Sequence, residues 1–248
     1  MSLANRLQGH FEYTEYFHLA WLWNRQMSNV LMIGLGGAST QRLFQHYYPR
    51  VAIDTAEIDP SVVEVARKYF SFKESTNQTV QVSDGRMFLR RSTKKYDAII
   101  VDAYMKNRYG SFIPYHLATK EFFELASKQL TEQGVIAFNV IGQLQGWRAD
   151  IIGALYKTMN AVFPQVYLFP ARETLNVVMI ATKSAEKMTA PELNRRASEL
   201  FSQGRPILPN FKARMMSFRA EPPPTATSSP VLTDDYAPID GLLNTVRR

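Results

Sequence analysis

The chain has 248 residues, of which 46% are hydrophobic and 21% charged, a balance typical of globular proteins and unlike disordered or collagen-like chains. It contains no cysteine, which excludes disulfides, thiolate metal sites and cysteine nucleophiles. The formal net charge is +7, but the basic residues are spread along the chain and no nucleic-acid-binding motif accompanies them, so no nucleic-acid partner is expected.

Short apolar runs alternate with amphipathic segments over most of the chain. The apolar residues at 30–34 and 96–102 follow one another almost without interruption, as in strands that are buried on both faces. Such strands indicate a parallel sheet covered by helices on each side. The pattern predicts strands at 30–34, 51–58, 79–82, 96–102 and 135–141, and helices at 39–48, 60–70, 85–91, 120–130 and 147–163.

The alternation of strands and helices ends with two strand-like runs, 166–169 and 176–182, separated by only a few residues. This spacing predicts a hairpin, and hence one antiparallel strand at the edge of the sheet. A dinucleotide-binding domain would continue with another helical crossover instead. We therefore predict an α/β fold, a Rossmann-like seven-stranded sheet of the S-adenosylmethionine-dependent methyltransferase type, with a C-terminal antiparallel hairpin.

Three segments are predicted from these patterns. Residues 1–29 precede the first strand, and residues 30–183 form an α/β domain. Residues 184–248 contain a helix at 190–203, a basic irregular stretch at 204–219 and a proline-rich linker at 221–230. A polar DDYAP sequence at 234–238 follows the linker.

Three features predict a nucleoside site at the carboxyl ends of the first strands. The sequence GLGGAS at 34–39 opens a helix, and Gly34, Gly36 and Gly37 would let the backbone approach a ligand. Glu57 lies 21 positions after Gly36, where an acidic residue binds ribose hydroxyls. Asp84 and Gly85 follow the third strand, where a carboxylate can accept a hydrogen bond from an adenine amino group.

Nicotinamide and S-adenosyl ligands share much of this pattern. The hairpin, the serine in place of the third glycine of a dinucleotide motif and the position of Asp84 favour an S-adenosyl ligand. Asp102 ends the fourth strand and would reach the same crevice, either as a general base for an amine or as a counter-charge for a cationic substrate.

The sequence resembles the spermidine synthase (polyamine aminopropyltransferase) family, in particular a divergent bacterial spermidine synthase-like branch. The resemblance rests on residues 13–15, 30–39, 56–59, 83–85, 96–102, 113–117 and 234–238.

The resemblance implies that residues 1–29 are a truncated N-terminal segment and that residues 30–183 form a nucleoside-binding catalytic domain. It also implies specific roles for individual residues. Glu57 would bind the ribose and Asp84 the adenine of decarboxylated S-adenosylmethionine, the co-substrate. Asp102 would take a proton from an amine such as putrescine, which then receives the aminopropyl group. Tyr13 and Tyr104 would line the amine pocket. No metal is needed, because the sulfonium provides the leaving group, and a homodimer is expected.

Two departures from the family pattern leave other functions open. Gly37 and Met105 stand where the family has carboxylates, and we predict that Asp234, Asp235 and Asp240 of the tail replace them. Without an acidic residue at position 37, intact S-adenosylmethionine would be admitted, so a methyltransferase is the alternative. A non-catalytic relative that binds a nucleoside or polyamine is the other.

No apolar run reaches the length of a membrane span, and no signal peptide is visible. We therefore expect a cytoplasmic protein with a small-molecule amine substrate and no membrane partner.

Overall fold

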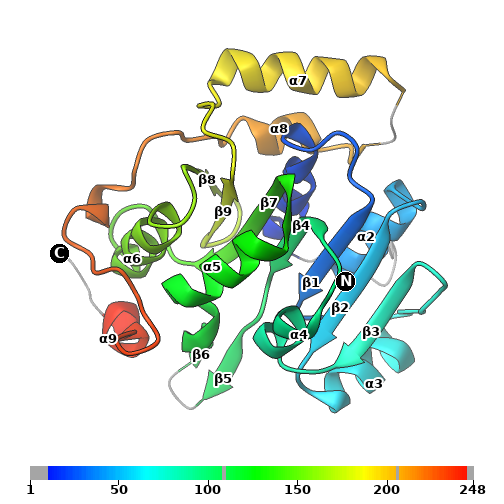
Figure 1. Ribbon diagram of the computed structural model, residues 1–248, viewed down its shortest axis with the longest axis horizontal. Helices are drawn as coiled ribbons and strands as arrows, with labels where there is room; N and C mark the ends of the chain where they lie inside the picture. Colours follow the sequence, from blue (N-terminus) through cyan, green and yellow to red (C-terminus); the bar gives the residue numbers. More distant parts are fainter. Residues whose placement is uncertain (1–10, 108–109, 205–206, 245–248) are drawn as a thin grey trace.

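The computed structural model describes residues 11–107, 110–204 and 207–244, and its centre is a single seven-stranded sheet (Figure 1). The strand order is β3-β2-β1-β4-β7-β9-β8, and β5 and β6 form a separate hairpin. The strands are β1 (Asn29–Ile33), β2 (Ala52–Glu57), β3 (Gln78–Val82), β4 (Tyr96–Val101), β5 (Met105–Asn107), β6 (Gly110–Phe112), β7 (Leu130–Ile141), β8 (Gln165–Pro170) and β9 (Asn176–Thr182).

The sheet confirms the predicted fold class, with one correction to its edge. Strands β3, β2, β1, β4 and β7 are parallel, and β8 and β9 form the predicted hairpin. The antiparallel strand is β9, which pairs with both β7 and β8 and therefore lies one place inside the edge. The prediction of an antiparallel edge strand was wrong, because β9, the second strand of the hairpin, inserts between β7 and β8 and leaves β8 at the edge.

Local signals fix where several helices begin. Pro60 occupies the first turn of α3, and Asp59 caps it by accepting a hydrogen bond from the Ser61 amide at 2.8 Å. Asp84 and Thr119 cap α4 and α5 in the same way. The helices are α1 (Tyr13–Tyr16), η1 (Phe17–Leu22), α2 (Ser39–Tyr47), α3 (Pro60–Tyr69), α4 (Gly85–Arg91), η2 (Tyr115–Leu117), α5 (Lys120–Gln129), α6 (Ala149–Asn160), α7 (Ala190–Ser202), α8 (Phe211–Met215), η3 (Pro224–Ala226) and α9 (Ile239–Asn244).

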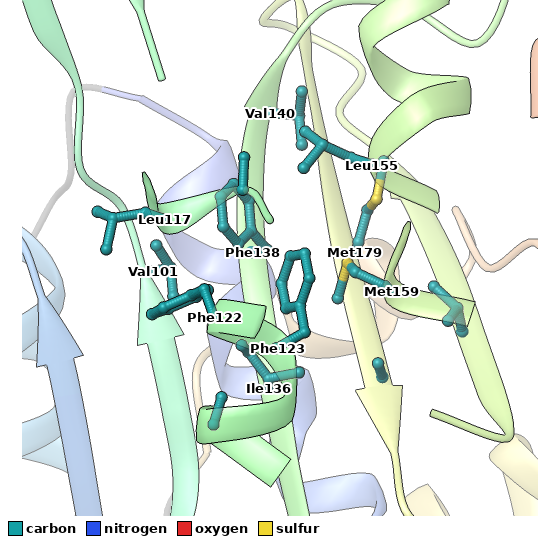
Figure 2. Packing of buried hydrophobic residues seen from close by; sticks show 14 of the residues in the cluster. Val101, Leu117, Phe122, Phe123, Ile136, Phe138, Val140, Leu155, Met159 and Met179 are labelled. Atoms are coloured by element: carbon teal, nitrogen blue, oxygen red, sulfur yellow. The ribbon is translucent and has the colours of Figure 1, made fainter. Parts of the chain in front are cut away.

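Alternate residues of each central strand enter different hydrophobic cores. Leu31 and Ile33 of β1 pack with α4, α5 and α6, whereas Val30 and Met32 pack with η1, α2, α7 and α8. Figure 2 shows the first of these cores, where Phe123 of α5 lies against Phe138 of β7 with ring centroids 5.8 Å apart. Helices therefore cover both faces of the sheet, as the uninterrupted apolar strands predicted.

The C-terminal segment packs on the α/β domain along much of its length. Thr225 and Ser229 are buried, and they donate hydrogen bonds to backbone carbonyls at the start of α6. The predicted proline-rich linker therefore does not act as a free spacer, because its hydroxyl and apolar side chains are packed against α6. In the described part of the chain, no helix has both the length and the apolar composition needed to cross a membrane.

Candidate active site

A cleft of about 490 Å³ opens at the carboxyl ends of β1, β2 and β4. Its walls come from the loop after β1, the end of β2, the start of α4, the residues after β4 and helix α1. This is the expected place for a ligand in an open α/β sheet. The lining includes nine of the twelve residues predicted for the site: Tyr13, Gly34, Gly36, Gly37, Glu57, Asp84, Gly85, Asp102 and Tyr104.

The loop after β1 needs glycine at position 34 for two separate reasons. The φ angle of Gly34 is +100°, a conformation that L-residues rarely adopt. A Cβ placed there would lie only 2.4 Å from the carbonyl oxygen of Asp102. Gly36 also has a positive φ, +50°, but a Cβ there would meet nothing within 4 Å. Gly34 therefore allows the loop after β1 and the Asp102 backbone to lie in direct contact.

The Glu57 carboxylate is held rigidly at the end of β2. Its Oε2 accepts a hydrogen bond from the Leu35 amide at 2.8 Å, and its Oε1 accepts one from the Asp59 amide at 3.0 Å. Glu57 is only 8% exposed. Each carboxylate oxygen has about two acceptor sites, so both oxygens can still accept a hydroxyl hydrogen from a ligand. This arrangement suits a ribose with two neighbouring hydroxyls.

The two carboxylate oxygens of Asp84 have different partners, one in the backbone of α4 and one in the cleft lining. Its Oδ1 caps α4 through the Met87 amide at 2.9 Å, and its Oδ2 lies 2.7 Å from Nε2 of His116. A carboxylate is an acceptor only, so Nε2 of His116 is the donor in this pair. Both residues line the cleft. No local pattern could have assigned His116 to this pair, because its partner lies 32 positions away.

Asp102 follows β4 and is tied to two side chains from distant parts of the chain. Its Oδ1 accepts a hydrogen bond from Nδ2 of Asn139 at 2.9 Å, and its Oδ2 accepts one from the Tyr13 hydroxyl at 3.2 Å. Burial raises the pKa of Asp102 to about 6, although both hydrogen bonds act to lower it. Burial and the negative charge of Asp102 raise the pKa of Tyr13, so its phenol stays a donor.

A second layer of hydrogen bonds orients Asn139, which is not among the residues predicted for the site. Its Oδ1 accepts a hydrogen bond from Nδ2 of Asn176 on β9 at 2.9 Å, which directs its Nδ2 toward Asp102. Tyr104 lines the cleft with its ring, but its hydroxyl donates to the Asn139 carbonyl and accepts from the Ile141 amide. Tyr104 can therefore offer a substrate an aromatic face and not a free hydroxyl.

Asp234, Asp235 and Asp240 are not among the residues that line the cleft, so the prediction that they replace the two absent carboxylates was wrong. Both oxygens of Asp234 are hydrogen-bonded to Arg86, and Oδ1 also accepts from Thr119. Asp235 is exposed to solvent. In the described part of the chain, no group of three or more His, Cys, Asp or Glu side chains is arranged to hold a metal ion.

The family model for the spermine/spermidine synthase domain matches residues 10–195, three quarters of the chain. The chain belongs to this family. A curated relative, the polyamine aminopropyltransferase of Vibrio vulnificus, is 30% identical over 237 residues, which are 92% of this chain and 74% of that protein. The resemblance noted from the sequence motifs is thus confirmed, and the named relative is a transferase.

Solved structures of two kinds share the fold. One, described as a probable spermidine synthase from Corynebacterium glutamicum, aligns with a TM-score of 0.71 and 20% identity, covering 94% of this chain and 84% of that one. The other, human methyltransferase-like protein 13 in complex with SAH, aligns with a TM-score of 0.67 and 23% identity, covering 83% and 93%. At these identities the two alignments establish the fold and no specific activity.

Proposed function

We propose that this member of the spermidine synthase family transfers an aminopropyl group from decarboxylated S-adenosylmethionine to an amine such as putrescine. The observation that carries the proposal is Asp102, a carboxylate at the end of β4 whose two oxygens are oriented by Asn139 and Tyr13. It faces the same cleft as Glu57 and Asp84, which we propose bind the ribose and the adenine. Gly34, Gly36, Gly37 and Gly85 would shape the nucleoside wall of that cleft.

The chemistry requires a base, because an amine with a pKa near 10 is mostly protonated at neutral pH. Asp102, with a pKa of about 6, is ionised at pH 7 and can take that proton. The amine nitrogen then bonds to the carbon beside sulfur, the C–S bond breaks, and methylthioadenosine leaves with the electron pair. Tyr13 and Asn139 hold the carboxylate in place as it changes from charged to neutral. The ring of Tyr104 would pack against the alkyl chain of the amine.

A methyltransferase is the second candidate because the glycine-containing loop after β1, residues 34–38, has no acidic residue. Among the described residues that line the cleft, the carboxylates are Glu57, Asp84 and Asp102. A Cβ built at Gly37 lies 3.3 Å from the Phe70 ring, so an apolar side chain borders this position. Nothing acidic at Gly37 would repel the carboxylate of intact S-adenosylmethionine, or bind the free amine of the decarboxylated form.

Thermal unfolding with three separate ligands tests the proposal: decarboxylated S-adenosylmethionine, S-adenosylmethionine and methylthioadenosine. A ligand at 100 times its Kd stabilises the folded protein by about 2.7 kcal/mol, which gives a clear rise in Tm. We expect the decarboxylated form to raise Tm more than the intact form, and putrescine to be consumed when both substrates are present. A larger rise with intact S-adenosylmethionine would favour the methyltransferase. No rise with any of the three would favour a relative that lacks this co-substrate.

The pH dependence of catalysis gives a second prediction. The carboxylate form of Asp102 is the active base, so activity is lost as pH falls through its pKa of about 6. We expect kcat/KM for the nucleoside co-substrate, measured at saturating amine, to rise with pH through a midpoint near 6. In Tyr13→Phe one of the hydrogen bonds that lower the pKa of Asp102 is absent, so the midpoint should move to higher pH. A midpoint that does not move in this variant would contradict the view that the Tyr13 hydroxyl lowers the pKa of Asp102.

A further inference from the structure

The DDYAP sequence of the tail is tied to the start of α4 by an ion pair between Asp234 and Arg86. The two Nη atoms of Arg86 each donate to a different oxygen of Asp234, and both distances are 2.7 Å. Thr119 adds a third hydrogen bond to Oδ1 of Asp234 at 2.7 Å. Two-point pairing of this kind fixes the guanidinium in orientation as well as position.

The tail that carries Asp234 is itself anchored at the start of α5. The Asp234 amide donates to Oε2 of Glu121 at 2.9 Å, and the Leu232 carbonyl accepts from the Lys120 amide at 2.8 Å. Leu232 is fully buried, and its amide donates to the Thr158 hydroxyl at 2.9 Å. Asp234 is therefore presented from a fixed backbone, although its side chain is 43% exposed.

Arg86 connects Asp234 to the part of the cleft that contains His116 and Asp84. Its Nη1 also donates to the carbonyl oxygen of His116 at 3.1 Å. The ring of His116 donates in turn to Asp84 at 2.7 Å, and both of these residues line the cleft. A continuous chain of hydrogen bonds thus links Asp234, Arg86, His116 and Asp84.

We propose that Asp234 is a positioning residue for recognition of the adenine base, acting through Arg86 and His116 on the Asp84 carboxylate. The proposal rests on the proposed function, in which Asp84 accepts a hydrogen bond from the adenine amino group. Asp234 also neutralises Arg86, which follows Asp84 by two residues and lies within its electrostatic range. Without Asp234, the freed guanidinium would compete with adenine for the Asp84 carboxylate.

The test compares two nucleosides that differ at position 6 of the purine, the group with which Asp84 would form its hydrogen bond. Methylthioadenosine carries an amino group at position 6 of the purine, and methylthioinosine carries a carbonyl oxygen there. The Kd of each is measured by titration calorimetry for the full chain, for Asp234→Asn and for Asp235→Asn. The second variant is a matched control, because Asp235 is the adjacent residue, is exposed and lies outside the cleft lining.

We expect the unsubstituted chain and Asp235→Asn to prefer methylthioadenosine. In Asp234→Asn its Kd should rise by about tenfold or more, the size expected for one impaired hydrogen bond to a charged group, and the preference should shrink accordingly. In turnover assays the same variant should raise KM for the co-substrate with little change in kcat, because Asp102 is untouched. Arg86→Lys keeps the positive charge but not the two-point geometry, so it should lose the same preference.

The outcomes separate this inference from the function on which it rests. If the unsubstituted chain binds neither nucleoside, the proposed function fails and the inference fails with it. If the unsubstituted chain discriminates and both Asp234→Asn and Arg86→Lys discriminate equally well, only the inference is overturned. Equal weakening of both nucleosides, together with a lower Tm, would assign Asp234 a purely structural role and would also overturn the inference.

Discussion

Asp102→Asn is expected to lower kcat by about 10²–10⁴-fold, the range over which general bases contribute to catalysis. The amide is nearly the same size as the carboxylate but cannot accept the proton of the attacking amine. Its Nδ2 would also face either the Asn139 amide group or the Tyr13 hydroxyl, both of which are donors here. The substitution therefore removes the base and disturbs its two partners.

The same variant should bind methylthioadenosine with a Kd within about twofold of the unsubstituted chain, since Glu57 and Asp84, the proposed nucleoside ligands, are held by hydrogen bonds that do not involve Asp102. Its Tm at neutral pH should change little, because removing a charge that is poorly solvated offsets the loss of the two disturbed hydrogen bonds. Steady-state turnover, calorimetry and thermal unfolding together check these expectations. Unchanged kcat in Asp102→Asn would eliminate Asp102 as the base, and unchanged kcat with unchanged pH dependence would place the chemistry elsewhere in the cleft.

The parts of the fold that depend on neighbouring residues were predictable from the sequence. The uninterrupted apolar run at β4 identified a strand buried on both faces, and the Asp84 cap places the start of α4 at Gly85, as predicted. Glu57 ends one strand of the parallel sheet, and Asp84 and Asp102 follow two others, so their convergence at a single cleft follows from strand direction alone. Their location could therefore be predicted without knowing which helices pack on which face of the sheet.

The parts that depend on contacts between distant segments were not predictable. Asp234 and Arg86 are separated by 148 positions, and nothing in the DDYAP sequence indicates that its partner lies on α4. Asn176 reaches Asn139 only because β9 is inserted between β7 and β8, an arrangement that the two apolar runs did not reveal. Helices α1, η1 and α8 and the β5–β6 hairpin were also missed, since each is short and has little periodicity of its own.

The end of β4 at Asp102 and the glycine-containing loop after β1 are joined through the backbone. The Asp102 amide donates to the Ile33 carbonyl at 2.9 Å, and the Gly34 amide donates to the Ala56 carbonyl at 2.9 Å. The ends of β1, β2 and β4 are therefore hydrogen-bonded to one another at the point where the glycine-containing loop after β1 begins. Any residue larger than glycine at position 34 must push the Asp102 backbone aside.

Gly34→Ala is accordingly expected to lower both the stability of the fold and kcat. Holding alanine at such a backbone angle costs about 1–3 kcal/mol of strain. Relieving the 2.4 Å approach of its Cβ to the Asp102 carbonyl costs about 1–3 kcal/mol more, as overpacking does in a tight interior. A displacement of Asp102 by about 1 Å would also lower kcat about 10²-fold. Chemical denaturation and steady-state kinetics measure the two effects.

Gly36→Ala is the matched control, because it separates backbone strain from the steric clash. Gly36 has a φ of +50° and open space where a methyl group would lie, so alanine there meets only the cost of the left-handed conformation, roughly 1–2 kcal/mol. The Asp102 carbonyl should stay in place, and kcat should change by less than about threefold, a difference smaller than one hydrogen bond would produce. Any effect of the methyl group on the co-substrate should appear in KM instead, because Gly36 lines the cleft. If Gly34→Ala and Gly36→Ala lost stability and kcat equally, contact between the loop and Asp102 would have no special role. A loss of kcat confined to Gly34→Ala would show that this contact sets the position of the catalytic carboxylate.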